Sequence, residues 1–221
     1  MKKLVLFCIM AMSLFANEII GHLIFKKGLV KVQHTHSIKK SSLKINSPIY
    51  KGDKISTYNS LATIELNDKS IIKLDKYSTI KFTNKIEQKT GKVYYHITKR
   101  KQKMLQVATI FTTIGVKGTT FIVDSNKIKM VALKKGLISL TSPKGKYEIH
   151  KKRLLTEYEL YKLEMSNAFN SYKKNLYKEF IEYKKSFDLK QNHLVTFNGN
   201  KVYEKELNAS KYFPYFEKNF K

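Results

Sequence analysis

The feature that most constrains the fold is a series of short segments in which apolar and polar residues alternate. Residues 61–66 (LATIEL) place Ala62, Ile64 and Leu66 on one face, which is the period of two expected of a β-strand. Asn67 and Asp68 then mark a turn, and residues 70–74 (SIIKL) alternate again. Short alternating segments at close spacing, without helical periodicity between them, are typical of an all-β roll, barrel, sandwich or solenoid.

Further strands are expected along the first part of the chain, and Gly52, Gly91, Gly136 and Gly145 supply turn signals between them. These strands are expected at residues 29–32, 80–82, 93–97, 107–112, 119–123, 129–133, 137–140 and 147–149. The pattern therefore predicts that residues 17–153 form a mainly β domain, a roll or solenoid-like structure of about ten short strands.

The apolar period changes in residues 154–221, which are predicted to form a helical extension. Its apolar residues recur every three or four positions, which predicts one long amphipathic helix. They are Tyr158, Tyr161, Met165, Phe169, Tyr172, Leu176, Phe180, Tyr183 and Phe187. Such a helix either packs on its own β domain or docks a partner protein. The residues expected to dock a partner are Phe169, Tyr172, Leu176, Phe180 and Tyr183.

The last part of this extension has two further features. Residues 194–197 and 201–203 flank an Asn198-Gly199 pair, which predicts a small hairpin with a type I′ turn. After it comes an aromatic tail that is expected either to pack or to bind something. The tail residues are Tyr212, Phe213, Tyr215, Phe216 and Phe220.

The amino terminus is typical of a secretory signal peptide. Lys2 and Lys3 precede an apolar run at residues 4–15, and small residues including Ala16 follow it. We expect residues 1–16 to be removed after Ala16, and the mature chain to be periplasmic or secreted. The one cysteine, Cys8, lies in the apolar run, so the mature chain is expected to have no disulfide or thiolate zinc site. No later segment is long and apolar enough for a membrane span.

The chain carries 43 lysines and arginines against 17 acids, a net charge of +26, but Arg occurs only at Arg100 and Arg153. Specific recognition of phosphates and bases relies mostly on arginine, so a charge made almost entirely of lysine does not by itself identify a nucleic-acid partner. Two interpretations of the charge follow. One is a solvated, lysine-rich surface. The other is a polyanion-binding surface for acidic glycan, lipopolysaccharide or extracellular nucleic acid. The residues of that surface would be Lys99, Arg100, Lys101, Lys103, Lys134, Lys135, Lys151, Lys152 and Arg153.

No catalytic or metal constellation is evident in the sequence. His34 and His36 would share a face of a strand, but no third ligand follows at a suitable spacing, and a loop is the more usual interpretation. Asp53, Asp68 and Asp75 fall at turns, where aspartate has a structural role. We therefore predict a protein that is not an enzyme and has no cofactor or metal.

The most informative stretch is residues 112–124 (TTIGVKGTTFIVD). Gly115 and Gly118 interrupt a strand pattern, which indicates a sharp bend or a close approach of the backbone. A phosphate-binding loop would need a helix after the glycines, whereas here the pattern of a strand follows, and this excludes nucleotide binding by that motif.

This stretch resembles the FecR-domain family, whose signature is a Val-x-Gly-Thr-x-Phe-x-Val run. The matching residues are Val116, Gly118, Thr119, Phe121 and Val123. Residues 52–57 (GDKIST), beginning with Gly52 and Asp53, are similar to the family's Gly-Asp-x-Ile-x-Thr segment, and Gly136 fits the closing part. The following hairpin also resembles that of the family, through Ser60, Ala62, Leu66, Asp68, Ser70, Ile72 and Leu74.

The resemblance implies an extracytoplasmic, β-rich domain that is not an enzyme. Full-length regulators of this family relay a signal from an outer-membrane transporter, through one membrane helix, to a sigma factor. This sequence shows a cleavable-looking signal in place of that helix. We therefore expect a stand-alone exported FecR-like protein that contacts an envelope protein in signalling or assembly.

Overall fold

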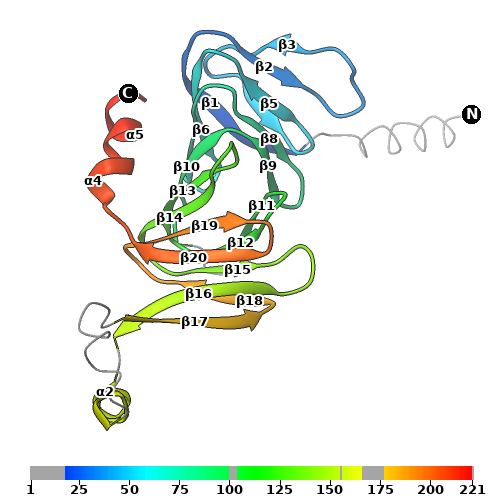
Figure 1. Cartoon of the computed structure of the whole chain (residues 1–221). Helices are drawn as coiled ribbons and strands as arrows, with labels where there is room; N and C mark the ends of the chain where they lie inside the picture. Colours follow the sequence, from blue (N-terminus) through cyan, green and yellow to red (C-terminus); the bar gives the residue numbers. More distant parts are fainter. Residues whose placement is uncertain (1–17, 100–103, 155, 166–176, 221) are drawn as a thin grey trace, which may run out of the picture.

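The computed structural model describes residues 18–99, 104–154, 156–165 and 177–220. It is built from two large β-sheets that face each other, with short helices at the carboxyl end and on one arm (Figure 1). The predicted signal peptide, residues 1–16, lies outside the described residues. No helix within the described ranges is long and apolar enough to cross a membrane.

The strands are given in their order across each sheet. The eleven-stranded sheet runs β17 (Tyr177–Lys184), β16 (Tyr147–Leu154), β20 (Lys201–Glu206), β19 (His193–Asn198), β14 (Lys129–Lys135), β13 (Thr120–Asp124), β10 (Lys92–His96), β7 (Ile71–Leu74), β6 (Leu61–Leu66), β1 (Ile19–Lys27) and β4 (Pro48–Tyr50). The nine-stranded sheet runs β18 (Ser186–Leu189), β15 (Ile138–Thr141), β12 (Thr113–Val116), β11 (Leu105–Ala108), β9 (Ile86–Thr90), β8 (Thr79–Phe82), β5 (Lys54–Thr57), β2 (Val30–Gln33) and β3 (Ser41–Ser42).

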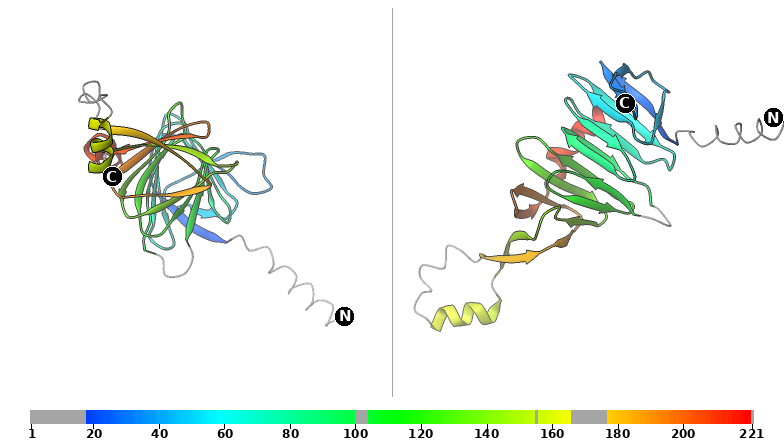
Figure 2. Two further views of the ribbon diagram at one scale, coloured as in Figure 1. Left: turned by 60° about the horizontal axis from the view of Figure 1, so that its bottom comes forward. Right: turned by 90° about the vertical axis from the view of Figure 1, so that its right-hand side faces the viewer.

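The chain advances through the two sheets in step, which gives the stacked, elongated body of Figure 2. Short hairpins such as β6–β7 and β8–β9 stay within one sheet, and the connections between them cross to the other. Neighbouring strands are antiparallel except for the parallel pairs β9–β11 and β16–β20. The mainly β architecture agrees with the sequence prediction, but β1–β16 are sixteen strands rather than about ten. Strands β17, β18, β19 and β20, from the predicted extension, join the same sheets.

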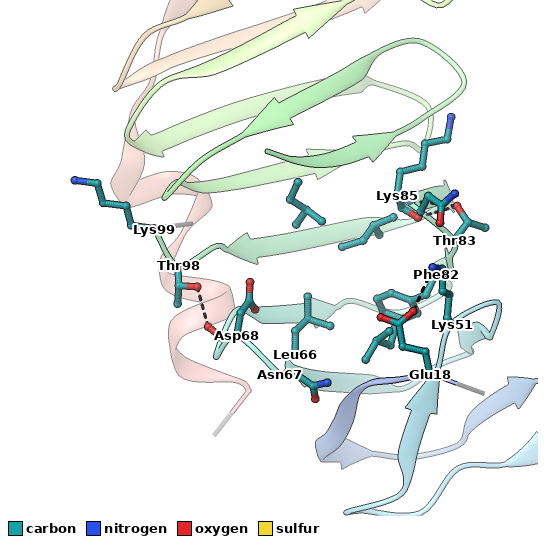
Figure 3. A pocket seen from close by; sticks show the side chains of 14 residues that line it. Glu18, Lys51, Leu66, Asn67, Asp68, Phe82, Thr83, Lys85, Thr98 and Lys99 are labelled. Carbon is teal, nitrogen blue, oxygen red and sulfur yellow. Dashed lines mark hydrogen bonds and ion pairs between the residues drawn. The ribbon is translucent and has the colours of Figure 1, made fainter. Parts of the chain in front are cut away.

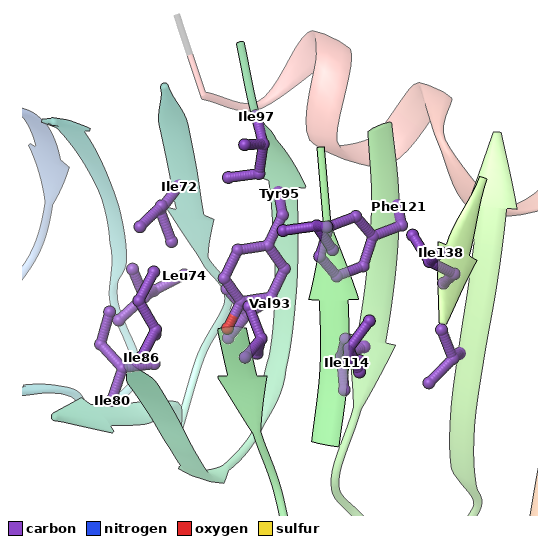
Figure 4. Packing of buried hydrophobic residues seen from close by; sticks show 14 of the residues in the cluster. Ile72, Leu74, Ile80, Ile86, Val93, Tyr95, Ile97, Ile114, Phe121 and Ile138 are labelled. Atoms are coloured by element: carbon purple, nitrogen blue, oxygen red, sulfur yellow. The ribbon is translucent and has the colours of Figure 1, made fainter. Parts of the chain in front are cut away.

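The hydrophobic core lies between the sheets (Figure 4). Strands such as β7 and β8 alternate buried and half-buried residues because one face of each points into this core. At its centre the rings of Tyr95 and Phe121 stack with centroids 4.9 Å apart. The Tyr95 hydroxyl donates to Gln88 Oε1 at 2.9 Å, and Gln88 Nε2 donates to the carbonyls of Gly91 and Val123. Burial raises the pKa of Tyr95, so this hydroxyl stays a donor.

The predicted long helix is wrong. The structure has a nine-residue helix, α2 (Glu157–Met165), and then strands β17 and β18 where the helix was expected to continue. Strand β17 pairs with β16 over eight successive residues. Tyr, Phe and Ile are enriched in strands, and the pairing of β17 with β16 outweighs the local helical period of the sequence. Tyr158, Tyr161 and Met165 are exposed on α2, so they form no buried face there.

The predicted hairpin at the carboxyl end is present as β19–β20, in which Asn198 pairs with Lys201. Its turn differs from the expected type I′, because φ is positive at Gly199 but not at Asn200. The hairpin aligns along β14 on one side and β16 on the other. It therefore continues the eleven-stranded sheet and does not form a separate unit.

The aromatic tail packs against the outer face of the eleven-stranded sheet. It forms two short helices, α4 (Ala209–Tyr212) and α5 (Pro214–Lys218). Phe213 and Phe216 are buried against Tyr94, and the Phe216 ring stacks on Tyr94 at 5.7 Å. Burial, and to a lesser extent the charge of Glu217, raises the pKa of Tyr94 to about 12. Of the two roles expected for the tail, the structure shows packing on its own sheet.

Polar contacts fix the position of the tail. Lys73 Nζ donates to the Phe216 carbonyl at 2.9 Å, and Lys134 Nζ lies 2.6 Å from Glu217 Oε1. The Tyr215 hydroxyl donates to Asp75 Oδ1 at 2.7 Å. Each contact joins the tail to a segment at least eighty residues earlier in the chain. The carboxyl end is therefore an integral outer layer of the sheet.

Candidate functional site

The Gly52-Asp53 pair builds the turn between β4 and β5. Gly52 has a φ of +96° and its N–H donates to the Phe82 carbonyl. The buried Asp53 carboxylate accepts from the Tyr50 N–H at 2.9 Å, and its other oxygen lies 2.8 Å from His34 Nδ1. His34 therefore contacts a carboxylate that stabilises the β4–β5 turn. The described residues contain no group of three possible metal ligands.

The residues of the main motif lie in β12, β13 and the turns beside them. Val116, Phe121 and Val123 are fully buried in the core between the sheets. Gly115 lies in β12, where an added Cβ would meet the Met104 side chain at 2.8 Å. Gly118 has a φ of +73° and precedes the buried Thr119. The motif therefore has a structural role: its apolar side chains fill the core between the sheets, and Gly118 allows the tight turn between β12 and β13.

Gly136, at the turn between β14 and β15, tests whether a glycine of this motif is needed for stability. Its φ is +98°, and an added Cβ would lie 2.7 Å from Thr119 Cγ2 and 3.0 Å from the Gly118 carbonyl oxygen. We expect Gly136→Ala to lower the free energy of unfolding by more than about 1 kcal/mol. Urea denaturation checks this. The matched control is Gly145→Ala, where φ is also positive but no atom lies within 4 Å of the added Cβ, so only the backbone cost applies.

A groove opens along one lateral side of the body (Figure 3). The β5–β6, β7–β8 and β9–β10 connections cross between the sheets on the opposite side of the body. On the groove side the chain crosses at residues 51–53 and again after β10, and between these points the β6–β7 and β8–β9 hairpins each turn back within their own sheet. The sandwich is left open there, with a cavity of about 850 Å³. Small-molecule sites usually fall between about 300 and 1,000 Å³, so the groove is large enough for a ligand.

The floor of the groove is apolar and its rim is polar. Three core residues, from both sheets, line the cavity: Leu66, Phe82 and Ile86. The partly buried apolar side chains of Ile20 and Leu105 extend this surface. Lys51, Lys85 and Lys99 supply positive charge at the rim, and Glu18 and Asp68 supply negative charge. Lys51 Nζ lies 3.2 Å from Glu18 Oε2, so this pair is largely self-neutralised.

The predicted docking residues fall in two groups. Phe169, Tyr172 and Leu176 lie outside the described residues, whereas Phe180 and Tyr183 lie on β17. The side chain of Phe180 is half-buried, and Tyr183 is 63% exposed. These two residues are therefore presented by a strand at the end of a sheet, and not by a helix.

Strand β17 forms one edge of the eleven-stranded sheet, on the arm that β16 and β17 build beside α2 (Figure 1). Near Tyr183 the sheet also exposes Ile181 and Tyr203, with 49% and 40% of their surface accessible. The His150 ring stacks on Tyr203 with centroids 4.6 Å apart. Ile181 and Tyr203 both flank His150 in register. We call Ile181, Tyr183, Tyr203 and His150 the arm patch. The sequence did not indicate this patch, because the spacing of its apolar residues predicted a helix in place of β17.

Those of the predicted polyanion-binding residues that the structure describes lie near the ends of three strands of the eleven-stranded sheet. Strands β10, β14 and β16 run in the same direction, and Lys99, Lys134–Lys135 and Lys151–Arg153 lie at or just after their ends. Arg100, Lys101 and Lys103 lie outside the described residues. Lys134 pairs with Glu217 at 2.6 Å, and Lys151 lies 3.7 Å from Glu182. The basic residues are aligned, but acids offset part of their charge.

Comparison with known proteins agrees with the resemblance seen in the sequence. Residues 53–139 match the model of the family described as FecR protein. The fold is similar to two crystal structures, at 1.65 and 2.50 Å resolution, of a protein from Parabacteroides distasonis ATCC 8503 inferred to be an anti-sigma factor. The TM-scores are 0.52 and 0.51, with 13% and 12% identity over 75% of this chain. This chain spans 65% and 64% of the length of those structures. No curated protein sequence matches it.

Proposed function

We propose that this chain, which carries a FecR domain at residues 53–139, is an exported protein without enzymatic activity that acts by protein–protein contact in envelope signalling. The observation that carries the proposal is the family match within a fold similar to that of a protein inferred to be an anti-sigma factor. The signal-like amino terminus supports export. In this role the domain is a rigid carrier of a contact surface and performs no chemical step.

The arm patch is the surface that we assign to the partner. Among the described residues, β16 is the strand that pairs with β17, so the outer edge of β17 offers backbone N–H and C=O groups to a further strand. A partner strand added there would gain main-chain hydrogen bonds. The exposed side chains of Ile181 and Tyr183 would supply the apolar contacts that give specificity. Tyrosine is also enriched at the energetic centres of protein interfaces.

A double substitution in the arm patch tests this assignment. We expect Ile181→Glu with Tyr183→Glu to reduce recovery of the partner from envelope fractions at least about ten-fold, because two buried charges would face an apolar interface. The measurement is a pull-down with the tagged mature chain. The matched control is Ile24→Glu with Tyr77→Glu, at residues 41% and 64% exposed elsewhere on the surface. Equal recovery by both double variants would contradict the assignment.

A second candidate function is polyanion binding by the aligned basic side of the sheet. Its support is the shared direction of β10, β14 and β16, which carries Lys99, Lys134–Lys135 and Lys151–Arg153 to one side. Counterion release makes such binding fall steeply with salt, whereas an apolar protein contact survives it. Washing the pull-down at low and high salt therefore separates the two functions. A protein retained at high salt favours the first, and glycan, lipid or nucleic acid lost at high salt favours the second.

A further inference from the structure

We propose that the lateral groove binds an anionic amphiphile, a single apolar chain that ends in a carboxylate. The inference rests on the groove alone and is independent of the arm patch, which lies on the far end strands of the sheet. Lys85 would receive the carboxylate, and the apolar chain would lie over Phe82, Ile86 and Leu66.

The floor of the groove suits an apolar chain. Phe82, Ile86 and Leu66 belong to the main core and also line the cavity, so a chain placed over them continues the core outward. Ile20 and Leu105 pack against the same cluster and are only partly buried. A ligand chain would remove their remaining apolar surface from water, which is the favourable step in binding such a molecule.

The charges favour an anionic head over a cationic one. Glu18 is paired with Lys51, and Asp68 Oδ1 accepts the Ser70 N–H at 3.0 Å as part of the β6–β7 turn. Lys85 and Lys99 form no ion pair with an acid among the described residues, and the acid nearest in sequence to Lys85, Glu87, is held by Lys89 at 2.7 Å. The hydrogen bond from Lys89 is the main reason that the pKa of Glu87 is lowered, and the charge of Lys85 lowers it further by a smaller amount without forming an ion pair. The two lysines are thus available to a ligand.

Lys85 is the better placed of the two for the head group. It is half-buried and directly precedes the floor residue Ile86, whereas Lys99 is exposed. Figure 3 shows the two lysines at opposite ends of the groove, with Leu66 between them. A lysine stem can cover apolar surface while its ammonium stays at the rim, so the flexible side chain of Lys85 can place its charge on a carboxylate beside Ile86. A carboxylate at Lys85 leaves its chain free to run along the floor toward Leu66.

Calorimetric titration with sodium dodecanoate, below its micelle concentration, tests the proposal. We expect saturable one-to-one binding that Lys85→Gln weakens about ten-fold, as the loss of a charge-assisted hydrogen bond predicts. The matched control is Lys81→Gln, since Lys81 is also half-buried but lies in β8 opposite Lys54, away from the groove lining. Dodecyltrimethylammonium, with the same chain and the opposite charge, is expected not to bind. Equal weakening by both variants, or no saturable binding of dodecanoate, overturns the proposal.

A spectroscopic readout keeps the test independent of the variants. In the methyl NMR spectrum of the wild-type chain, dodecanoate is expected to shift Ile20, Leu66, Ile86 and Leu105. The methyls of Ile181 and Ile24, on the arm and on β1, are expected to stay unchanged. Shifts spread over the surface without these four would indicate general attraction to a basic protein and would overturn the site.

Discussion

Phe121→Ala is expected to lower the free energy of unfolding by about 3–5 kcal/mol, the usual loss when a buried aromatic ring is removed. The Phe121 side chain is fully buried at the centre of the core, and its ring stacks on Tyr95 at 4.9 Å. Its removal leaves a cavity that strands on both sides hold open, and also uncovers one face of Tyr95. Urea denaturation followed by circular dichroism measures the change.

The burial of Phe121 also predicts that the loss of unfolding free energy depends on the size of the side chain that replaces it. Phe121→Leu retains most of the apolar volume and is expected to cost less than the alanine change. Tyr77→Ala serves as the surface control, since Tyr77 is 64% exposed and a substitution there should change stability by less than about 1 kcal/mol. A loss below about 1 kcal/mol for Phe121→Ala would contradict a core role for the family motif.

Phe216→Ala is the second large effect, and we expect it also to cost about 3–5 kcal/mol. Phe216 is fully buried between Tyr94 on one side and Phe220 on the other, with ring centroids at 5.7 and 5.2 Å. The change would loosen α5 and expose apolar surface on the outer face of the sheet. Thermal and urea unfolding, with dye binding to exposed apolar surface, measure both consequences.

An exposed aromatic residue on α2 provides the control for Phe216→Ala. Tyr158→Ala removes an aromatic ring that is 65% exposed, so its expected effect on unfolding is within about 0.5 kcal/mol. If Phe216→Ala were equally mild, the tail would not be part of the folded body. It would then be free to serve as a binding segment for another molecule.

Much of the β domain could be predicted from the sequence because its signals are local. The alternation in residues 61–66 and 70–74 places Ile64, Ile72 and Leu74 in the core, and a strand pattern needs only neighbouring residues to be visible. The FecR resemblance was likewise readable, because Val116, Phe121 and Val123 are close in sequence and share one buried environment.

The features that were missed depend on contacts distant in sequence. Residues 177–184 are a strand because β16 lies beside them, and the spacing of Phe180 and Tyr183 carries no trace of that neighbour. The groove is formed by two hairpin turns from different sheets, so its lining is scattered from Glu18 to Leu105. The tail residues were recognised as aromatic, but their position over Tyr94 required the assembled sheet.

In-cell photo-crosslinking from position 183 tests the central claim most directly. A photoreactive amino acid in place of Tyr183, and separately in place of the exposed Tyr77, would be activated in intact cells and the products washed at high salt. The proposed function predicts one discrete protein adduct from position 183 and none from position 77. Identical adducts from both positions, or adducts only to salt-labile polymer, would contradict a protein contact at the arm.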